Sequence, residues 1–267
     1  MAYLEKPTSK ESSSHWYTKT GKPAYEIQKK DGSGSRPTTL RDARKYNLLP
    51  SVTTIFNIMA KPSLDRWKSS QIIKACKELT QGENESDRNF EARVMDRSFH
   101  EVNKAADLGT RIHDAIDFSF DGYQVKEDLK VYVDPVLEYI HQKNFSRIER
   151  EEVIVSKVYG YAGRVDFSAL SANQYNCIVD FKTRKTQPGV KVTPYDFQSM
   201  QIAAYAFAKY GTLDNVYGAN IYISSTEPGR TEIVSYDSNV LKKDFKVFLS
   251  MLNIWKYLNN YNPGEHE

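Results

Sequence analysis

The stretches Arg164-Val-Asp-Phe-Ser-Ala-Leu170 and Cys177-Ile-Val-Asp-Phe-Lys182 decide the fold of this chain. Both are strand-like in composition, and the polar residues between them, 171–176, are typical of a turn. We therefore predict a β-hairpin. Because successive side chains on a strand alternate between its faces, Asp180 and Lys182 should project together, about 7 Å apart. Asp166 on the neighbouring strand can point toward the same place.

Two carboxylates beside one ammonium make this hairpin a candidate site. Carboxylate oxygens hold hard divalent cations, and a neighbouring ammonium can orient a water molecule or a phosphate. A surface ion pair on an exposed sheet is the commoner cause of an Asp/Lys alternation. The apolar neighbours Val179 and Phe181 argue against a fully exposed strand. The pattern therefore favours a site.

The segments around the hairpin indicate a fold that mixes helices and strands. Ser51 is a predicted N-cap, Gly109 a predicted helix break or point of close approach, and Thr193 a predicted N-cap of the helix after the hairpin. Apolar spacing predicts further helices and strands. The helices are expected near 51–60, 63–79, 90–120, 128–144, 193–210 and 239–257, and the strands near 153–158, 216–224 and 232–236. This order predicts an α/β (α+β) protein whose central mixed β-sheet is flanked by helices, with a helical N-terminal extension.

Composition places the chain among ordinary globular proteins. It has 267 residues, 27% of them charged and 40% hydrophobic, and a net charge of +3 that does not by itself imply nucleic-acid binding. We expect a single domain over 1–267, with a mostly helical part, 1–145, and a sheet core, 146–267. Cys76 and Cys177 have no metal-ligand spacing and suit a reducing compartment. No signal peptide or membrane span is evident, so we expect a cytoplasmic protein without membrane contact.

Other polar residues lie before and after the hairpin. His113 falls on the long helix upstream, and Gln201 and Tyr205 are four residues apart, hence on one face of the helix downstream. Glu151 and Glu152 begin the first strand. Taken singly, each has an ordinary explanation in packing or in a solvated charge run.

Four short motifs follow one another along the chain: Gly109…His113, Gly163…Asp166, Asp180…Lys182 and Gln201…Tyr205. Their order and predicted secondary structure resemble the RecB-like branch of the PD-(D/E)XK nucleases, whose pattern is Gly-xxx-His, Gly-xx-Asp, Asp-x-Lys and Gln-xxx-Tyr. The resemblance spans residues 105–236. Residues 49–54 look, more loosely, like the leading region of phage-encoded exonucleases of this type.

The resemblance implies a restriction-endonuclease-like core and a role for each matching residue. His113, Asp166 and Asp180 would ligate Mg²⁺ or Mn²⁺ together with the backbone carbonyl of Phe181. Lys182 would position or deprotonate the attacking water, or stabilise charge in the transition state. We favour positioning and charge stabilisation, because a lysine with its free pKa of ~10.4 is a poor base at pH 7. Gln201 and Tyr205 would brace the site and contact a phosphate of the substrate. Either Glu151 or Glu152 would reach the metal through a water molecule.

Basic residues near the hairpin suit a polyanionic substrate. We predict that DNA contacts Arg164, Arg184, Lys185 and Lys191. A solubilising loop would explain the same charges equally well.

These observations predict a metal-dependent DNA exonuclease that acts in recombination, repair or degradation, in the host cytoplasm if phage-encoded. A structure-specific or restriction-type endonuclease is an alternative, and so is a catalytically silent nucleic-acid-binding module on the same fold. No phosphate-binding loop of the Gly-xxxx-Gly-Lys-Ser/Thr kind is present, so unwinding would need a helicase partner. A recombinase or a single-strand-binding protein is a further partner of such an enzyme, and the oligomeric state is left open.

Overall fold

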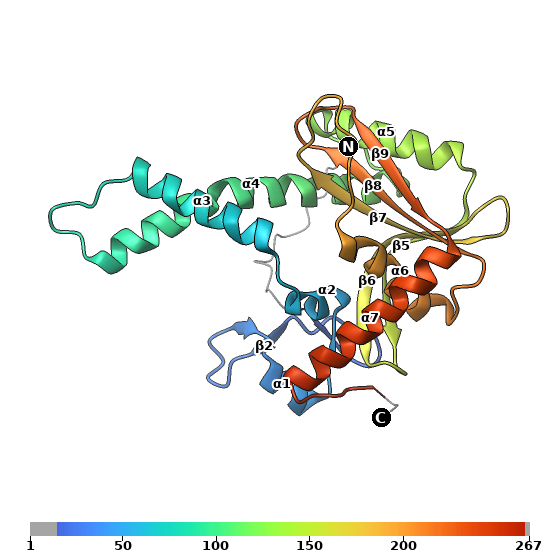
Figure 1. Ribbon diagram of the computed structural model, residues 1–267, viewed down its shortest axis with the longest axis horizontal. Helices are drawn as coiled ribbons and strands as arrows, with labels where there is room; N and C mark the ends of the chain where they lie inside the picture. Colours follow the sequence, from blue (N-terminus) through green and yellow to red (C-terminus); the bar gives the residue numbers. More distant parts are fainter. Residues whose placement is uncertain (1–14, 265–267) are drawn as a thin grey trace. The chain divides into compact units, whose positions relative to one another are not determined.

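A five-stranded mixed β-sheet forms the centre of the computed structural model, which describes residues 15–264 apart from the side chains of Glu101, Val102 and Asp196 (Figure 1). The strands lie in the order β5-β6-β7-β8-β9, and all neighbours are antiparallel except β7 and β8. Their bounds are β5 Ser146–Ser156, β6 Tyr161–Leu170, β7 Asn176–Arg184, β8 Val216–Ser224 and β9 Thr231–Tyr236. The predicted hairpin and the mixed α/β class are confirmed.

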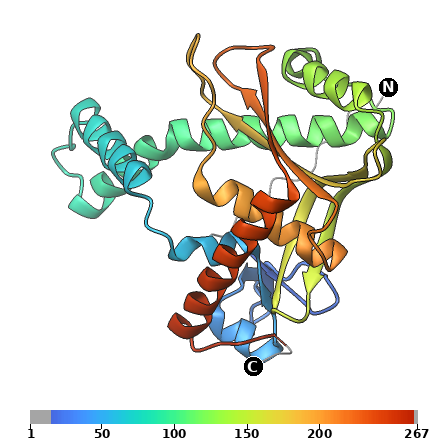
Figure 2. The same cartoon turned by 45° about the vertical axis from the view of Figure 1, so that its right-hand side comes forward.

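Helices cover both faces of this sheet (Figure 2). Helices α6 (Asp196–Tyr210) and α7 (Ser238–Leu258) pack against one face, where a Cβ on Gly218 would lie 2.5 Å from Ile202 and 3.3 Å from Leu241. The opposite face receives α5 (Glu127–Gln142) and the C-terminal part of α4 (Asp87–Phe120). There, aromatic rings of α4 contact rings of the sheet. The site residues of β6 and β7 thus lie between two helical layers.

Short elements precede the sheet in the chain. They are β1 (Trp16–Tyr17), β2 (Glu26–Gln28), β3 (Ser35–Pro37), α1 (Leu40–Tyr46), β4 (Leu49–Pro50), α2 (Val52–Ile55) and a 3-10 helix, η1 (Phe56–Ile58). Ser51 caps α2, because its hydroxyl accepts the Thr54 N–H at 3.0 Å, as predicted. Ser51 also forms an isolated parallel bridge to Ala162 of β6. This bridge joins the N-terminal segment to the strand that carries Asp166.

The chain divides into two compact units, one formed by 1–58 with 112–267 and the other by 59–111. The second unit contains α3 (Pro62–Glu78) and the N-terminal part of α4. Ala75 and Val94 are buried in it, and the Arg97–Glu78 ion pair (2.8 Å) joins its two helices. The expected single domain over 1–267 stays a prediction.

Two predicted local features differ in the structure. Helix α4 continues through Gly109, since the cost of about 1 kcal/mol for one interior glycine is small beside the rest of a 34-residue helix. Helix α6 starts at Asp196 and not after Thr193. The Gln198 side chain accepts the Tyr195 N–H at 2.8 Å, which makes Tyr195 the N-cap.

None of the helices in the described part of the chain is both long and apolar enough to cross a membrane.

Candidate active site

Strands β6 and β7 part from each other at the candidate site. Their ladder runs from Leu170↔Asn176 to Phe167↔Val179. Beyond Phe167, β6 continues along β5, and beyond Val179, β7 continues along β8. We call this point the β6–β7 fork. Asp166 and Asp180 are the next residues on the two strands, so the fork presents two carboxylates from two sides.

Asp180 is buried and held by two donors. It is 2% exposed. The ammonium of Lys182, two residues along the strand, lies 2.7 Å from Asp180 Oδ2 and 2.9 Å from Oδ1. The Asn220 amide on β8 donates to Oδ2 at 2.9 Å. Asp180 and Lys182 therefore share one face, as the alternation along the strand predicted.

His113 and Phe181 complete the fork around Asp166. The Asp166 Oδ2 accepts the backbone N–H of Phe181 at 2.8 Å and lies 3.7 Å from His113 Nδ1. The His113 ring also bonds to the Phe181 backbone and packs edge-on against the Phe181 ring. The structure thus brings together His113, Asp166 and the Phe181 main chain, three of the predicted metal-binding groups.

Gln201 and Tyr205 lie on α6, the helix that packs against β6 and β7. Gln201 Nε2 donates to the Tyr205 hydroxyl at 2.9 Å, and both side chains are buried. The Tyr205 ring packs on Gly163 of β6 so closely that a Cβ there would lie 2.4 Å from Tyr205 Cε1. Gly163 is thus needed for close approach of the helix to the sheet.

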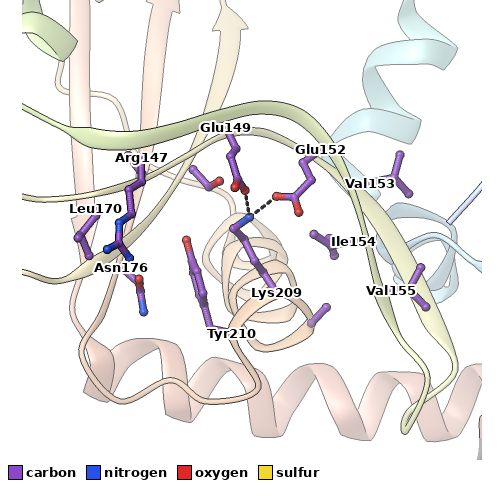
Figure 3. Close-up of a pocket in the computed structure, with 13 residues that line it drawn as sticks. Arg147, Glu149, Glu152, Val153, Ile154, Val155, Leu170, Asn176, Lys209 and Tyr210 are labelled. Carbon is purple, nitrogen blue, oxygen red and sulfur yellow. Dashed lines mark hydrogen bonds and ion pairs between the residues drawn. The ribbon is translucent and has the colours of Figure 1, made fainter. Parts of the chain in front are cut away.

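The two glutamates at the start of the sheet point in different directions. Glu151 has a left-handed φ of 49°, which interrupts the alternation of side chains along β5. It lines a cavity of about 10 Å³ together with His113 and Asp166. Glu152 instead points with Glu149 to the ammonium of Lys209, inside a separate pocket of about 460 Å³ (Figure 3). The structure brings Glu151, and not Glu152, to the fork.

The charges at the fork influence one another strongly. Burial, and then the neighbouring Asp180 carboxylate, raise the pKa of Asp166 to about 7. Burial, and then the Lys182 ammonium, lower the pKa of His113, which keeps the imidazole neutral and able to ligate. Burial opposes the charge on Lys182, but the Asp180 and Asp166 carboxylates outweigh it and raise the pKa of Lys182. Lys182 is therefore held as an ammonium.

The donor types at the fork fit a hard divalent cation. Carboxylate and carbonyl oxygens with one imidazole suit Mg²⁺ or Mn²⁺, and a cation would offset the cost of ionising Asp166 beside Asp180. Within residues 15–264, no three His, Cys, Asp or Glu side chains are already grouped as a metal-binding cluster. The donors are instead engaged in pairs, His113 with Asp166 and Asp180 with Lys182.

The four predicted DNA-contacting residues lie on β6, at the end of β7 and on the loop that follows β7. Arg164 lies 3.4 Å from Glu151 at the fork. Arg184 donates to the Thr193 carbonyl at 2.9 Å, and its guanidinium lies over the rings of Tyr195 and Tyr222. Lys185 and Lys191 are exposed on the loop after β7.

Two buried residues at the site were missed from the sequence. Asn220 on β8 and Tyr236 on β9 extend the hydrogen bonds of Asp180, with the Tyr236 hydroxyl donating to Asn220 Oδ1 at 2.9 Å. A buried asparagine between Ala219 and Ile221 in an apolar strand is a sequence signal for a polar contact, since an unpaired amide is costly to bury.

No family model and no curated protein sequence matches this chain. Among solved structures, the chain is similar to the protein SSO0001, at 15% identity and a TM-score of 0.31, over 72% of this chain and 87% of that one. It is also similar to a candidate exonuclease from Eubacterium rectale, at 14% identity and a TM-score of 0.36, over 61% of this chain and 73% of that one. Identities and TM-scores are low, so the functional assignment rests on the site itself.

Proposed function

We propose that this protein is a metal-dependent DNA nuclease that hydrolyses phosphodiester bonds as an exonuclease. The main support is the β6–β7 fork, where the Asp166 carboxylate accepts the Phe181 N–H and the Asp180 carboxylate contacts the Lys182 ammonium. Because the β6–β7 ladder ends at Phe167↔Val179, the two carboxylates lie where the strands no longer pair with each other, next to the small cavity that Asp166 shares with His113. The Asp180 carboxylate is buried, which is not expected for an ion pair on an exposed sheet surface.

The residues of the fork would hold Mg²⁺ or Mn²⁺ through His113, Asp166, Asp180 and the Phe181 carbonyl. Such a cation, when bound, supplies Lewis acidity toward the phosphate and lowers the pKa of water. Glu151 is placed to accept a hydrogen bond from water in the cavity that it shares with His113 and Asp166.

Lys182 contributes charge and position, and not proton abstraction. The carboxylates around it favour its ammonium form, and an ammonium has no lone pair with which to accept a proton. It can donate hydrogen bonds to the attacking water and to a phosphate oxygen on which charge develops. Asp180 sets its direction through the 2.7 Å contact.

DNA is the proposed partner because basic side chains lie beside the fork and along the segment that follows β7. Arg164 lies beside the fork, Arg184 lies over the rings of Tyr195 and Tyr222, and Lys185 and Lys191 are exposed on the loop after β7. The exonuclease mode, a role in recombination, repair or degradation, a phage origin, and a recombinase, single-strand-binding or helicase partner follow the resemblance to RecB-like nucleases.

The test is digestion of end-labelled single-stranded, linear duplex and closed circular DNA in the presence of Mg²⁺, Mn²⁺ or a chelator. We expect metal-dependent loss of linear DNA, with circular DNA intact. Cleavage of closed circles would replace the exonuclease with an endonuclease. DNA binding that persists in chelator, without cleavage of any substrate under any metal, would instead identify a silent binding module.

A further inference from the structure

Asn220 lies beside Asp180 at the centre of the sheet. Strands β7 and β8 are parallel there, and Asp180 is the register partner of Asn220. The side chain of Asn220 is 0% exposed and donates through Nδ2 to Asp180 Oδ2 at 2.9 Å. Its neighbours on the strand, Ala219 and Ile221, are apolar and buried, so Asn220 is a single polar position in an apolar stretch.

The orientation of the Asn220 amide is fixed from both ends. An ionised carboxylate only accepts hydrogen bonds, so the NH₂ group of Asn220 must face Asp180. Its carbonyl oxygen then faces the Tyr236 hydroxyl, which donates to it at 2.9 Å. Tyr236 is itself buried, next to the hydroxyl of Tyr222, and that hydroxyl donates to Gln198 Oε1 at 2.7 Å.

We infer that Asn220 and Tyr236 are positioning residues that set the orientation of the Asp180 carboxylate for binding the cation. This inference rests on the proposed function. Asn220 donates to Oδ2, which Lys182 also contacts at 2.7 Å, whereas Oδ1 is contacted by Lys182 at 2.9 Å. The lysine side chain is long and can move, but the amide is fixed in the sheet. Asn220 therefore keeps Oδ1 as the oxygen that the site offers to a cation.

Tyr236 acts through Asn220 and not on Asp180 directly. If its hydroxyl is removed, the buried Asn220 carbonyl loses its donor and the amide is held by the Asp180 carboxylate alone. An amide held at one end fixes the carboxylate less firmly. The two residues should therefore affect cation binding as one unit.

The experiment is a titration of the purified full chain with Mn²⁺ in the absence of DNA, with free Mn²⁺ followed by electron paramagnetic resonance. The variants are Asn220→Leu, Tyr236→Phe and the double variant, each checked for folding by circular dichroism. Since partners of metal ligands typically change metal affinity by 10–100-fold, we expect Asn220→Leu to weaken Mn²⁺ binding by about that factor. Tyr236→Phe should weaken it less, and the double variant no more than Asn220→Leu alone.

Tyr161→Phe is the matched control. Tyr161 is also a fully buried tyrosine with one donated hydrogen bond, to the Ala204 carbonyl at 2.9 Å. Its replacement should lower stability without changing the Mn²⁺ affinity. A purely structural role of Tyr236 predicts the same behaviour for Tyr236→Phe.

The possible results distinguish the proposed function from the positioning role of Asn220 and Tyr236. Wild-type protein that does not bind Mn²⁺ would refute the proposed function and this role with it. Wild-type protein that binds Mn²⁺ while folded Asn220→Leu or Tyr236→Phe binds it equally well would refute the positioning role alone. If the losses of Mn²⁺ affinity in the two single variants add up in the double variant, the action of Tyr236 through Asn220 is refuted. If Asn220→Leu does not fold, the Mn²⁺ affinity of Tyr236→Phe is compared with that of Tyr161→Phe. Equal affinities would refute the positioning role.

Discussion

The carboxylate of Asp166 accepts the backbone N–H of Phe181 at 2.8 Å, immediately beyond the last residue pair of the β6–β7 ladder. A side chain here takes the place that a main-chain carbonyl occupies in a continuous antiparallel ladder. The Phe181 amide is thereby satisfied while the strands separate. The same contact fixes one Asp166 oxygen within 3.7 Å of His113. The local fold and the candidate chemistry therefore depend on the same carboxylate.

Asp180→Asn should abolish cleavage while the fold is kept. Asparagine has the same shape and can still accept from Asn220 or Lys182, but it lacks the charge that holds a cation. Mutation of a residue that only hydrogen-bonds to a metal ligand typically lowers metal affinity or activity by about 10–100-fold. For the ligand itself we expect turnover to fall by more than about 100-fold. Digestion of end-labelled DNA measures this loss, and fluorescence anisotropy in chelator should show DNA affinity largely unchanged. Turnover at the wild-type rate would remove Asp180 from the site.

Gly163→Ala should destabilise the protein through Tyr205. The new methyl group would lie 2.4 Å from Tyr205 Cε1, which forces the ring or α6 to shift. Overpacking of this kind typically lowers the free energy of unfolding by about 1–3 kcal/mol. Urea unfolding at neutral pH measures the cost. In a Tyr205→Leu background the same substitution should cost less, because the obstructing ring is gone. Equal costs in both backgrounds would show that another contact limits the space at Gly163.

The sheet and most helices could be predicted because their signals are local. Apolar residues typical of strands mark β6, β7 and β8, and Ser51 followed by Val52 and Ile55 marks a capped helix. Helix α1 was missed. It begins with a capping box formed by Thr39 and Asp42, within a stretch whose polar composition resembles a loop.

Parts of the candidate site could not be predicted because they depend on register and on one backbone angle. Asn220 reaches Asp180 only because β8 pairs with β7 in one particular register across 40 residues of chain. The left-handed φ at Glu151 reverses the directions that strict alternation assigns to Glu151 and Glu152. An asparagine in an apolar strand indicates that it makes a polar contact, but neither its partner nor the backbone angle at Glu151 can be read from the order of the residues alone.

Asp42 should make a pH-dependent contribution to stability. Arg36 contacts it through two nitrogens, at 2.6 and 2.8 Å, and Thr39 donates to it, so the pKa of Asp42 is lowered. A lowered folded-state pKa gives stability that is complete above the unfolded pKa of ~3.9 and is lost as the pH falls through the folded value. We expect Asp42→Asn to cost about 1–2 kcal/mol at pH 7, as loss of a helix cap does.

Urea unfolding at several pH values checks the Asp42 prediction. The difference between wild type and Asp42→Asn should shrink as the pH drops below ~4. Asp134→Asn, at an exposed position on α5, is the control and should change little at any pH. A difference that stays constant down to low pH would mean that shape, and not charge, explains the effect of Asp42.

Glu151→Gln and Glu152→Gln form a matched pair that tests which glutamate serves the site. Glu151 lines the cavity of His113 and Asp166, whereas Glu152 contacts Lys209 on the other side of β5. We expect Glu151→Gln to raise the Mg²⁺ concentration needed for half-maximal cleavage by about 10–100-fold, the range for residues that contact a metal through water. Glu152→Gln should leave that concentration unchanged and lower the free energy of unfolding by about 1 kcal/mol, because Lys209 keeps Glu149 as a second partner. Metal-dependent cleavage assays of both variants decide between them, because the reverse ranking would assign the site to the side of the sheet that carries Lys209.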